Sequence, residues 1–110
     1  RYDLVTADAT VAVLAHVYTD TALRGPFLAS LPVAGKAGTL ANRLKGTPAE
    51  GVVLAKTGSF TNARAVAGFT TTADGEPVVF SVIANNYGVP TAPVDGATDA
   101  IILALTTLRR

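Results

Sequence analysis

A tight turn between two β-rich runs constrains the fold of this chain most strongly. Asp74-Gly75 separates the run 64–72, rich in threonine and valine, from the nearly continuous apolar run Val78–Asn85. An Asp-Gly pair between such runs is typical of a β-hairpin. A third run, Gly51–Ser59, comes earlier, and Thr61-Asn62 offers a reversal after it because asparagine tolerates left-handed backbone angles. The sequence therefore predicts a three-stranded antiparallel meander.

The residues before the meander show a helical spacing. Apolar residues recur there at 4-3-4 intervals, which predicts a helix over 7–18 with one apolar stripe. The stripe consists of Ala7, Val11, Leu14 and Tyr18. Pro26 can open a short helical turn through Ala29. One or two further turns over 39–45 would place Leu40 and Leu44 on one side.

A second helix is predicted after the meander. Asp95 is the expected N-cap of a helix over about 97–108. Its apolar stripe is expected to be Ile101, Leu105 and Leu108. The predicted fold class is therefore α+β: a helix, a three-stranded antiparallel meander, and a C-terminal helix packed on the sheet.

The strand Val78–Asn85 has apolar residues on both faces, with Phe80 and Val82 on one and Val79 and Ile83 on the other. An antiparallel sheet with one wet face would alternate cleanly, so both faces should be covered. The C-terminal helix can cover one face, and the first helix or protein outside this chain the other. Composition agrees, because only 15% of residues are charged, against about 25% in typical soluble domains.

Several functional classes find no support in the composition. The net charge is +1 without a basic block, so nucleic acid is not an expected partner. Cysteine is absent and His16 is the single histidine, so no metal or other cofactor is predicted. No apolar run approaches the roughly 20 residues that span a membrane. Because methionine is also absent, the chain is expected to be a segment of a longer polypeptide.

The triplet Lys56-Thr57-Gly58, followed by Ser59, is unusual in the strand predicted over 51–59. Alternation places Lys56 and Gly58 on one face and Thr57 and Ser59 on the other. A glycine lets another backbone approach, and a free strand edge can pair with an extended peptide. The lysine would add positive charge, the threonine a hydroxyl for an anion, and the Ser59 N–H an oxyanion-hole donor. Alternatively, Lys56 is a solvated lysine that protects an edge strand from pairing.

Other motifs accompany this triplet in a fixed order. They are Leu-Pro-Val-Ala-Gly at 31–35, Gly-Thr-Leu at 38–40 with Arg43, Ala-Lys-Thr-Gly-Ser-Phe at 55–60, and Ala-Gly-Phe at 67–69. Lys-Thr-Gly on a strand is a signature of serine penicillin-recognising enzymes. Together the motifs resemble the C-terminal part of the class C low-molecular-mass penicillin-binding proteins, the D-alanyl-D-alanine carboxypeptidase/endopeptidase family. The resemblance covers almost the whole chain.

The resemblance implies a serine peptidase that works outside the cytoplasm, in the periplasm or cell wall. Its substrates would be peptidoglycan stem peptides, and β-lactam antibiotics would trap its serine. At the matching positions, Lys56 would be catalytic and Thr57, Gly58 and Ser59 would bind substrate. Thr57 would bind the substrate carboxylate, and Ser59 would donate its N–H to the oxyanion.

Two serine motifs of the family have no match in this chain. The serines are Ser30, Ser59 and Ser81, and none has a lysine three residues later or an asparagine two residues later. In the family, Ser-x-x-Lys and Ser-x-Asn lie upstream. Residues 1–110 are thus expected to form the C-terminal segment of a peptidase domain, inactive without the upstream part. Two alternatives stay open: a β-lactamase or esterase on the same fold, or a non-catalytic wall-binding module.

Overall fold

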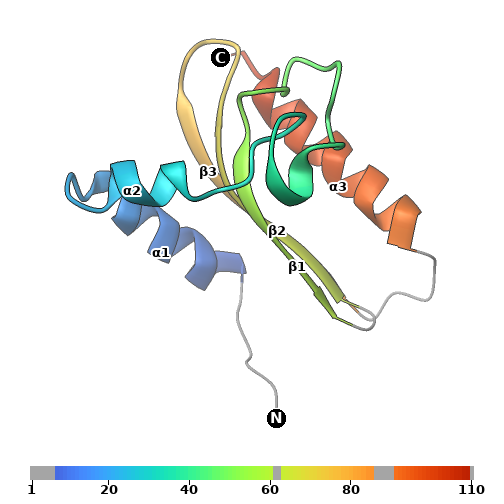
Figure 1. The fold of residues 1–110 in the computed structure, drawn as a ribbon, viewed down its shortest axis with the longest axis horizontal. Coiled ribbons are helices and arrows are strands. Elements are labelled where there is room, and N and C mark those ends of the chain that lie inside the picture. Colours follow the sequence, from blue (N-terminus) through green and yellow to red (C-terminus); the bar gives the residue numbers. More distant parts are fainter. Residues whose placement is uncertain (1–6, 61–62, 86–90, 110) are drawn as a thin grey trace.

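Three antiparallel strands form the centre of the molecule (Figure 1). The computed structural model describes residues 7–60, 63–85 and 91–109. The strands, in the spatial order β1-β2-β3, are β1 (Leu54–Phe60), β2 (Ala63–Thr71) and β3 (Pro77–Asn85). The helices are α1 (Ala7–Thr19), α2 (Arg24–Ala29) and α3 (Thr91–Thr106), with a short 3-10 helix η1 (Gly38–Leu40). The predicted α+β class with an antiparallel meander is confirmed. The predicted reversal at Thr61-Asn62 lies outside the described residues.

The register determines which side chains share a face of the sheet. Leu54 pairs with Phe69, which pairs with Val79, and all three pack in an apolar cluster with Leu14 of α1. Their strand neighbours point the other way, towards Ile102 of α3, which is 1% exposed. In Figure 1, α1 and α2 lie on one side of the sheet and α3 on the other. Both faces therefore receive helices, as the apolar pattern of the third strand predicted.

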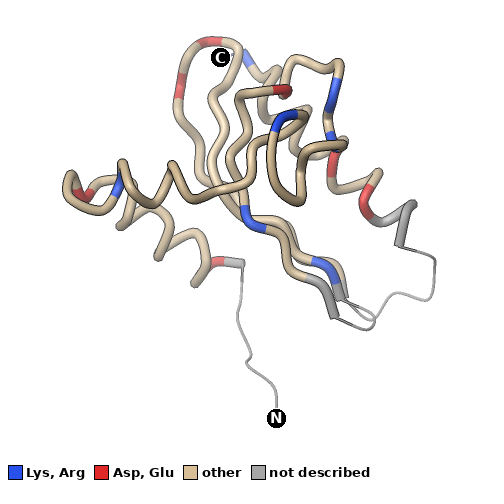
Figure 2. Tube along the Cα trace, viewed as in Figure 1, with Lys and Arg blue, Asp and Glu red and all other residues tan. Residues whose placement is uncertain are grey.

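The face that packs on α1 is covered along only part of its length. Ile83, which belongs to this face by register, is 38% exposed. Lys56 and Gly58 lie on the same face of β1 and are also exposed. Charged residues are sparse along the described part of the trace (Figure 2).

The helix α3 begins earlier than predicted. It starts at Thr91, so Asp95 lies inside the helix and the prediction of an N-cap there is wrong. Pro93 stands in the first turn, where the missing N–H would have had no partner within the helix. The proline therefore does not delay the start of the helix.

The buried side of α3 also differs from the predicted stripe. Thr98, Ile102 and Thr106 are buried, whereas Ile101 is 49% exposed. The Thr106 hydroxyl donates to the Ile102 carbonyl at 3.0 Å and lies 2.7 Å from the Thr70 hydroxyl. Hydrogen-bonded hydroxyls can be buried at little cost, so threonine can lie on the buried side of α3, which the prediction based on apolar residues alone did not identify.

The segment before β1 is mostly irregular. Only Gly38–Leu40 is helical, and Leu44 has a left-handed φ of 60°, so the predicted turns over 39–45 are largely absent. Leu40 and Leu44 nevertheless both enter the core. The strand begins at Leu54 instead of Gly51, because Gly51 has a φ of 76° and belongs to a turn.

Glu50 links two parts of this irregular segment. Its carboxylate accepts a hydrogen bond from the Gly46 N–H at 2.7 Å and lies 3.3 Å from the Lys36 ammonium. The hydrogen bond and the ammonium lower the pKa of Glu50. A lowered folded-state pKa contributes stability above the unfolded-state pKa, and this contribution disappears as the pH falls through the folded-state value.

We therefore expect Glu50→Gln to lower the unfolding midpoint slightly at pH 7 and to have less effect near pH 3. Thermal unfolding of both variants at the two pH values measures this difference. An equal effect at both pH values would mean that the carboxylate charge contributes nothing to the stability of this segment.

Candidate active site

The strand β1 lies at the edge of the sheet, and its outer side is covered only at its beginning. Val33 forms a bridge with Leu54 on the side opposite β2, and the Ala55 N–H donates to the Pro32 carbonyl at 3.1 Å. Among the residues that the structure describes, no strand continues this pairing beyond Ala55. The predicted site residues, at positions 56–59, follow this point directly.

Backbone groups at the open edge point outwards at alternate residues. Neighbouring residues of an antiparallel strand direct their N–H and C=O groups to opposite sides. Since the Ala55 N–H points away from β2, the N–H groups of Thr57 and Ser59 point the same way. The edge therefore offers two donors to an extended ligand.

Lys56 is exposed on the face that packs on α1. Its ammonium donates to the carbonyl of Thr57 at 2.6 Å, an acceptor on the open edge. In the described part of the chain, no carboxylate lies within ion-pair distance of Lys56. Its positive charge is therefore not neutralised by a neighbouring side chain there.

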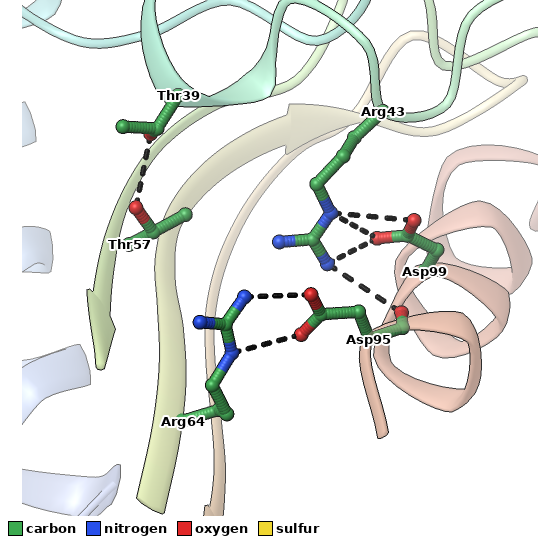
Figure 3. A network of polar contacts seen from close by, with 6 residues as sticks. All are labelled: Thr39, Arg43, Thr57, Arg64, Asp95 and Asp99. Atoms are coloured by element: carbon green, nitrogen blue, oxygen red, sulfur yellow. Dashed lines mark hydrogen bonds and ion pairs between the residues drawn. The ribbon is translucent and has the colours of Figure 1, made fainter. Parts of the chain in front are cut away.

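Thr57 points to the opposite face, towards η1. Its hydroxyl lies 2.9 Å from the hydroxyl of Thr39 (Figure 3). The two hydroxyls are 18 positions apart in the sequence and meet beside the open edge. Sequence reasoning included Gly-Thr-Leu at 38–40 in the family resemblance but gave Thr39 no role. Its place in a motif upstream of Lys-Thr-Gly was the signal that could have identified it.

Gly58 has no packing reason to be glycine within the described chain. A Cβ atom built at Gly58 would meet only the Ala65 Cβ, at 4.0 Å. Gly68 of β2 is different, because a Cβ there would lie 2.1 Å from the Leu54 carbonyl oxygen and 2.5 Å from the Ala55 Cα. The glycine at 58 thus leaves open space on the sheet, whereas the glycine at 68 permits the strands to approach.

Two ion pairs join the surroundings of the edge to α3 (Figure 3). The Arg43 guanidinium contacts the Asp99 carboxylate, with an Nε–Oδ1 distance of 3.1 Å. Arg64, which pairs with Ser59 across the sheet, contacts Asp95 at 2.6 and 3.0 Å. Such two-point guanidinium–carboxylate contacts are directional as well as strong. They fix the segment that follows η1 and the start of β2 to the same helix.

Two negative findings concern the described residues alone. The described residues contain no group of three or more His, Cys, Asp or Glu side chains that could hold a metal ion. None of the helices described is long and apolar enough to cross a membrane.

Comparison with known proteins gives consistent results for nearly the whole chain. The D-alanyl-D-alanine carboxypeptidase of Actinomadura sp. (strain R39) is 42% identical in an alignment 110 positions long, which covers 96% of this chain and 20% of that protein. Carboxypeptidase DacB of Mycolicibacterium smegmatis is 40% identical over 96% of this chain and 23% of its own length. The chain thus spans about a fifth of the length of these curated relatives.

Solved structures share the fold. Penicillin binding protein 4 (dacB) from Haemophilus influenzae matches with a TM-score of 0.83 and 26% identity, over 98% of this chain and 26% of that one. A crystal structure of the same protein complexed with a novel β-lactam (CMV) matches with a TM-score of 0.86 and 28% identity, over 98% of this chain and 27% of that one. The family profile of D-Ala-D-Ala carboxypeptidase 3 (S13) matches residues 1–107. The predicted family is therefore confirmed, and this chain belongs to the D-Ala-D-Ala carboxypeptidase 3 (S13) family.

Proposed function

We propose that this chain forms the substrate-binding wall of a serine-type D-Ala-D-Ala carboxypeptidase/endopeptidase that acts on peptidoglycan stem peptides outside the cytoplasm. The observation that supports this most is the open edge of β1, which presents Lys56, Thr57, Gly58 and Ser59 in succession. The nucleophilic serine would lie on the upstream part of the polypeptide. The active site is thus composite, and residues 1–110 supply one wall of it.

The substrate would bind as an extended peptide along this edge. Strand addition uses free backbone donors and acceptors, and the outward N–H groups of Thr57 and Ser59 are such donors. Gly58 leaves the space next to them open, so a substrate backbone can approach. The hydroxyl of Thr57 would donate to the carboxylate of the terminal D-alanine.

Acylation would then proceed at the carbonyl carbon of the penultimate D-alanine. The serine oxygen attacks this carbon, the serine proton passes to the amine nitrogen of the terminal D-alanine, the peptide bond to that residue breaks, and free D-alanine leaves. The developing oxyanion accepts a hydrogen bond from the Ser59 N–H, a contact typically worth about 3 kcal/mol in the transition state. Lys56 adds positive charge beside the nucleophile. Water later hydrolyses the acyl-enzyme and frees the serine.

Labelling with a fluorescent penicillin tests the proposal. The full-length polypeptide should bind the label covalently on a serine outside residues 1–110, and it should release D-alanine from a peptide ending in D-Ala-D-Ala. The isolated chain should not be labelled, because it lacks the nucleophile. Labelling of the isolated chain would contradict a composite site.

The alternatives give other outcomes in the same assays. Rapid hydrolysis of the β-lactam without release of D-alanine would indicate a β-lactamase. Hydrolysis of simple esters alone would indicate an esterase. A full-length protein that is neither labelled nor active would point to a non-catalytic wall-binding module.

A further inference from the structure

We propose that Thr39 is a positioning residue for Thr57, and that it donates a hydrogen bond to Thr57 when the Thr57 hydroxyl binds a carboxylate. The inference rests on the proposed function of Thr57. It starts from the 2.9 Å contact between the two hydroxyls, which the substrate-binding role of the Lys-Thr-Gly strand alone does not require.

The segment that holds Thr39 is firmly anchored in the protein although Thr39 itself is exposed. Leu40, the next residue, is 2% exposed and lies in the core between the sheet and α3. On the other side, a Cβ atom at Gly38 would lie 2.9 Å from the Cβ of Pro32. The backbone at Thr39 is thus confined on both sides, which limits where its hydroxyl can lie.

A third anchor comes from the ion pair between Arg43 and Asp99. Only 15% of the Arg43 side chain and 24% of the Asp99 side chain are exposed. The guanidinium also approaches the Asp95 carbonyl at 3.5 Å, so it is bound to two successive turns of α3 (Figure 3). The segment carrying Thr39 is therefore tied to α3 at the same place as Arg64 and β2.

The chemistry of hydroxyls explains why such a neighbour is useful. An ionised carboxylate accepts hydrogen bonds but donates none, whereas a hydroxyl does both. In this structure Thr57 donates to Thr39. When a carboxylate binds, the Thr57 proton turns towards it, and Thr39 can then donate its own proton to the Thr57 oxygen. The resulting chain of two hydrogen bonds polarises Thr57 and strengthens its bond to the substrate.

A double-mutant cycle in the full-length protein tests this role. We expect Thr39→Val to lower kcat/KM for a peptide ending in D-Ala-D-Ala about fivefold, the typical effect of losing one neutral hydrogen bond. Thr39→Ser should retain the wild-type value, and Thr39→Ala should resemble Thr39→Val. In the Thr57→Val background, Thr39→Val should have no further effect. Thr21→Val, in the exposed connection between α1 and α2, is the matched control.

A fivefold loss in both backgrounds would show that Thr39 acts independently of Thr57, and an unchanged kcat/KM would show that it does not act; either result overturns the inference. If the wild-type protein releases no D-alanine, the proposed function fails instead.

Crystal structures of the wild type and Thr39→Val test the positioning without turnover. In the wild type, the Thr57 side chain should have the rotamer that brings its hydroxyl to Thr39. In Thr39→Val it should adopt another rotamer, and an identical rotamer in both structures would overturn the inference.

Discussion

Replacement of Lys56 by alanine in the full-length protein is expected to lower the rate of acylation by a factor of about 100 or more, without a change in the unfolding temperature. The side chain of Lys56 is exposed, and among the described residues its ammonium has a hydrogen bond only to the carbonyl of the next residue, so we expect the fold not to depend on it. A charge placed where the transition state develops negative charge contributes on this scale. Stopped-flow acylation by a penicillin, together with thermal unfolding, measures both quantities.

Lys45→Ala is the matched control for Lys56→Ala. Lys45 is also an exposed lysine, but it lies in the irregular segment before β1 and outside the site. Its removal should leave acylation unchanged. If the two variants acylate equally fast, Lys56 is a solvated edge lysine, and the catalytic role proposed for it is wrong.

Replacement of Gly68 by alanine is expected to destabilise the protein by about 3 kcal/mol or more, at the upper end for overpacking in a core. The added methyl group would lie 2.1 Å from the carbonyl oxygen of Leu54 and 2.5 Å from the Cα of Ala55. Both are backbone atoms, so β1 and β2 would have to separate. The urea midpoint of the full-length protein measures the loss.

Gly58→Ala provides the contrast on the neighbouring strand. Its methyl group has room on the sheet, so the free energy of unfolding should stay within about 1 kcal/mol of the wild-type value. Acylation should nevertheless slow, because the methyl group would meet the approaching substrate. Comparable destabilisation by both glycine variants would mean that the strand pairing described here is wrong. Normal acylation by Gly58→Ala would argue against substrate binding along this edge.

The meander could be predicted from sequence because its signals are local. The Asp-Gly turn and the two long apolar runs set β2 and β3 to within about one residue of their observed ends. The start of β1 and the course of α3 depend on contacts that are distant in sequence. Gly51 has a positive φ, and Thr106 of α3 is buried with its hydroxyl hydrogen-bonded to Thr70 and to the helix backbone. Hydrophobic patterns do not report such bonds.

The sequence of the candidate site stood out, but the surroundings of that site could not be predicted. Lys-Thr-Gly could be recognised as unusual in a strand, and alternation placed Lys56 and Thr57 on opposite faces. The partner of Thr57 could not be predicted, because Thr39 lies in an irregular segment whose path is set by Leu40 and by the ion pair of Arg43. The ion pair between Asp95 and Arg64 of β2 could not be predicted either, because it joins residues 31 positions apart.

The most direct test of the composite site is a crystal structure of the full-length protein acylated by a penicillin. We predict that the penicillin carboxylate lies within hydrogen-bond distance of the Thr57 hydroxyl. The acyl carbonyl oxygen should accept a hydrogen bond from the Ser59 N–H, and the acylated serine should lie outside residues 1–110. An adduct whose carboxylate and carbonyl oxygen both lie away from β1 would contradict the account.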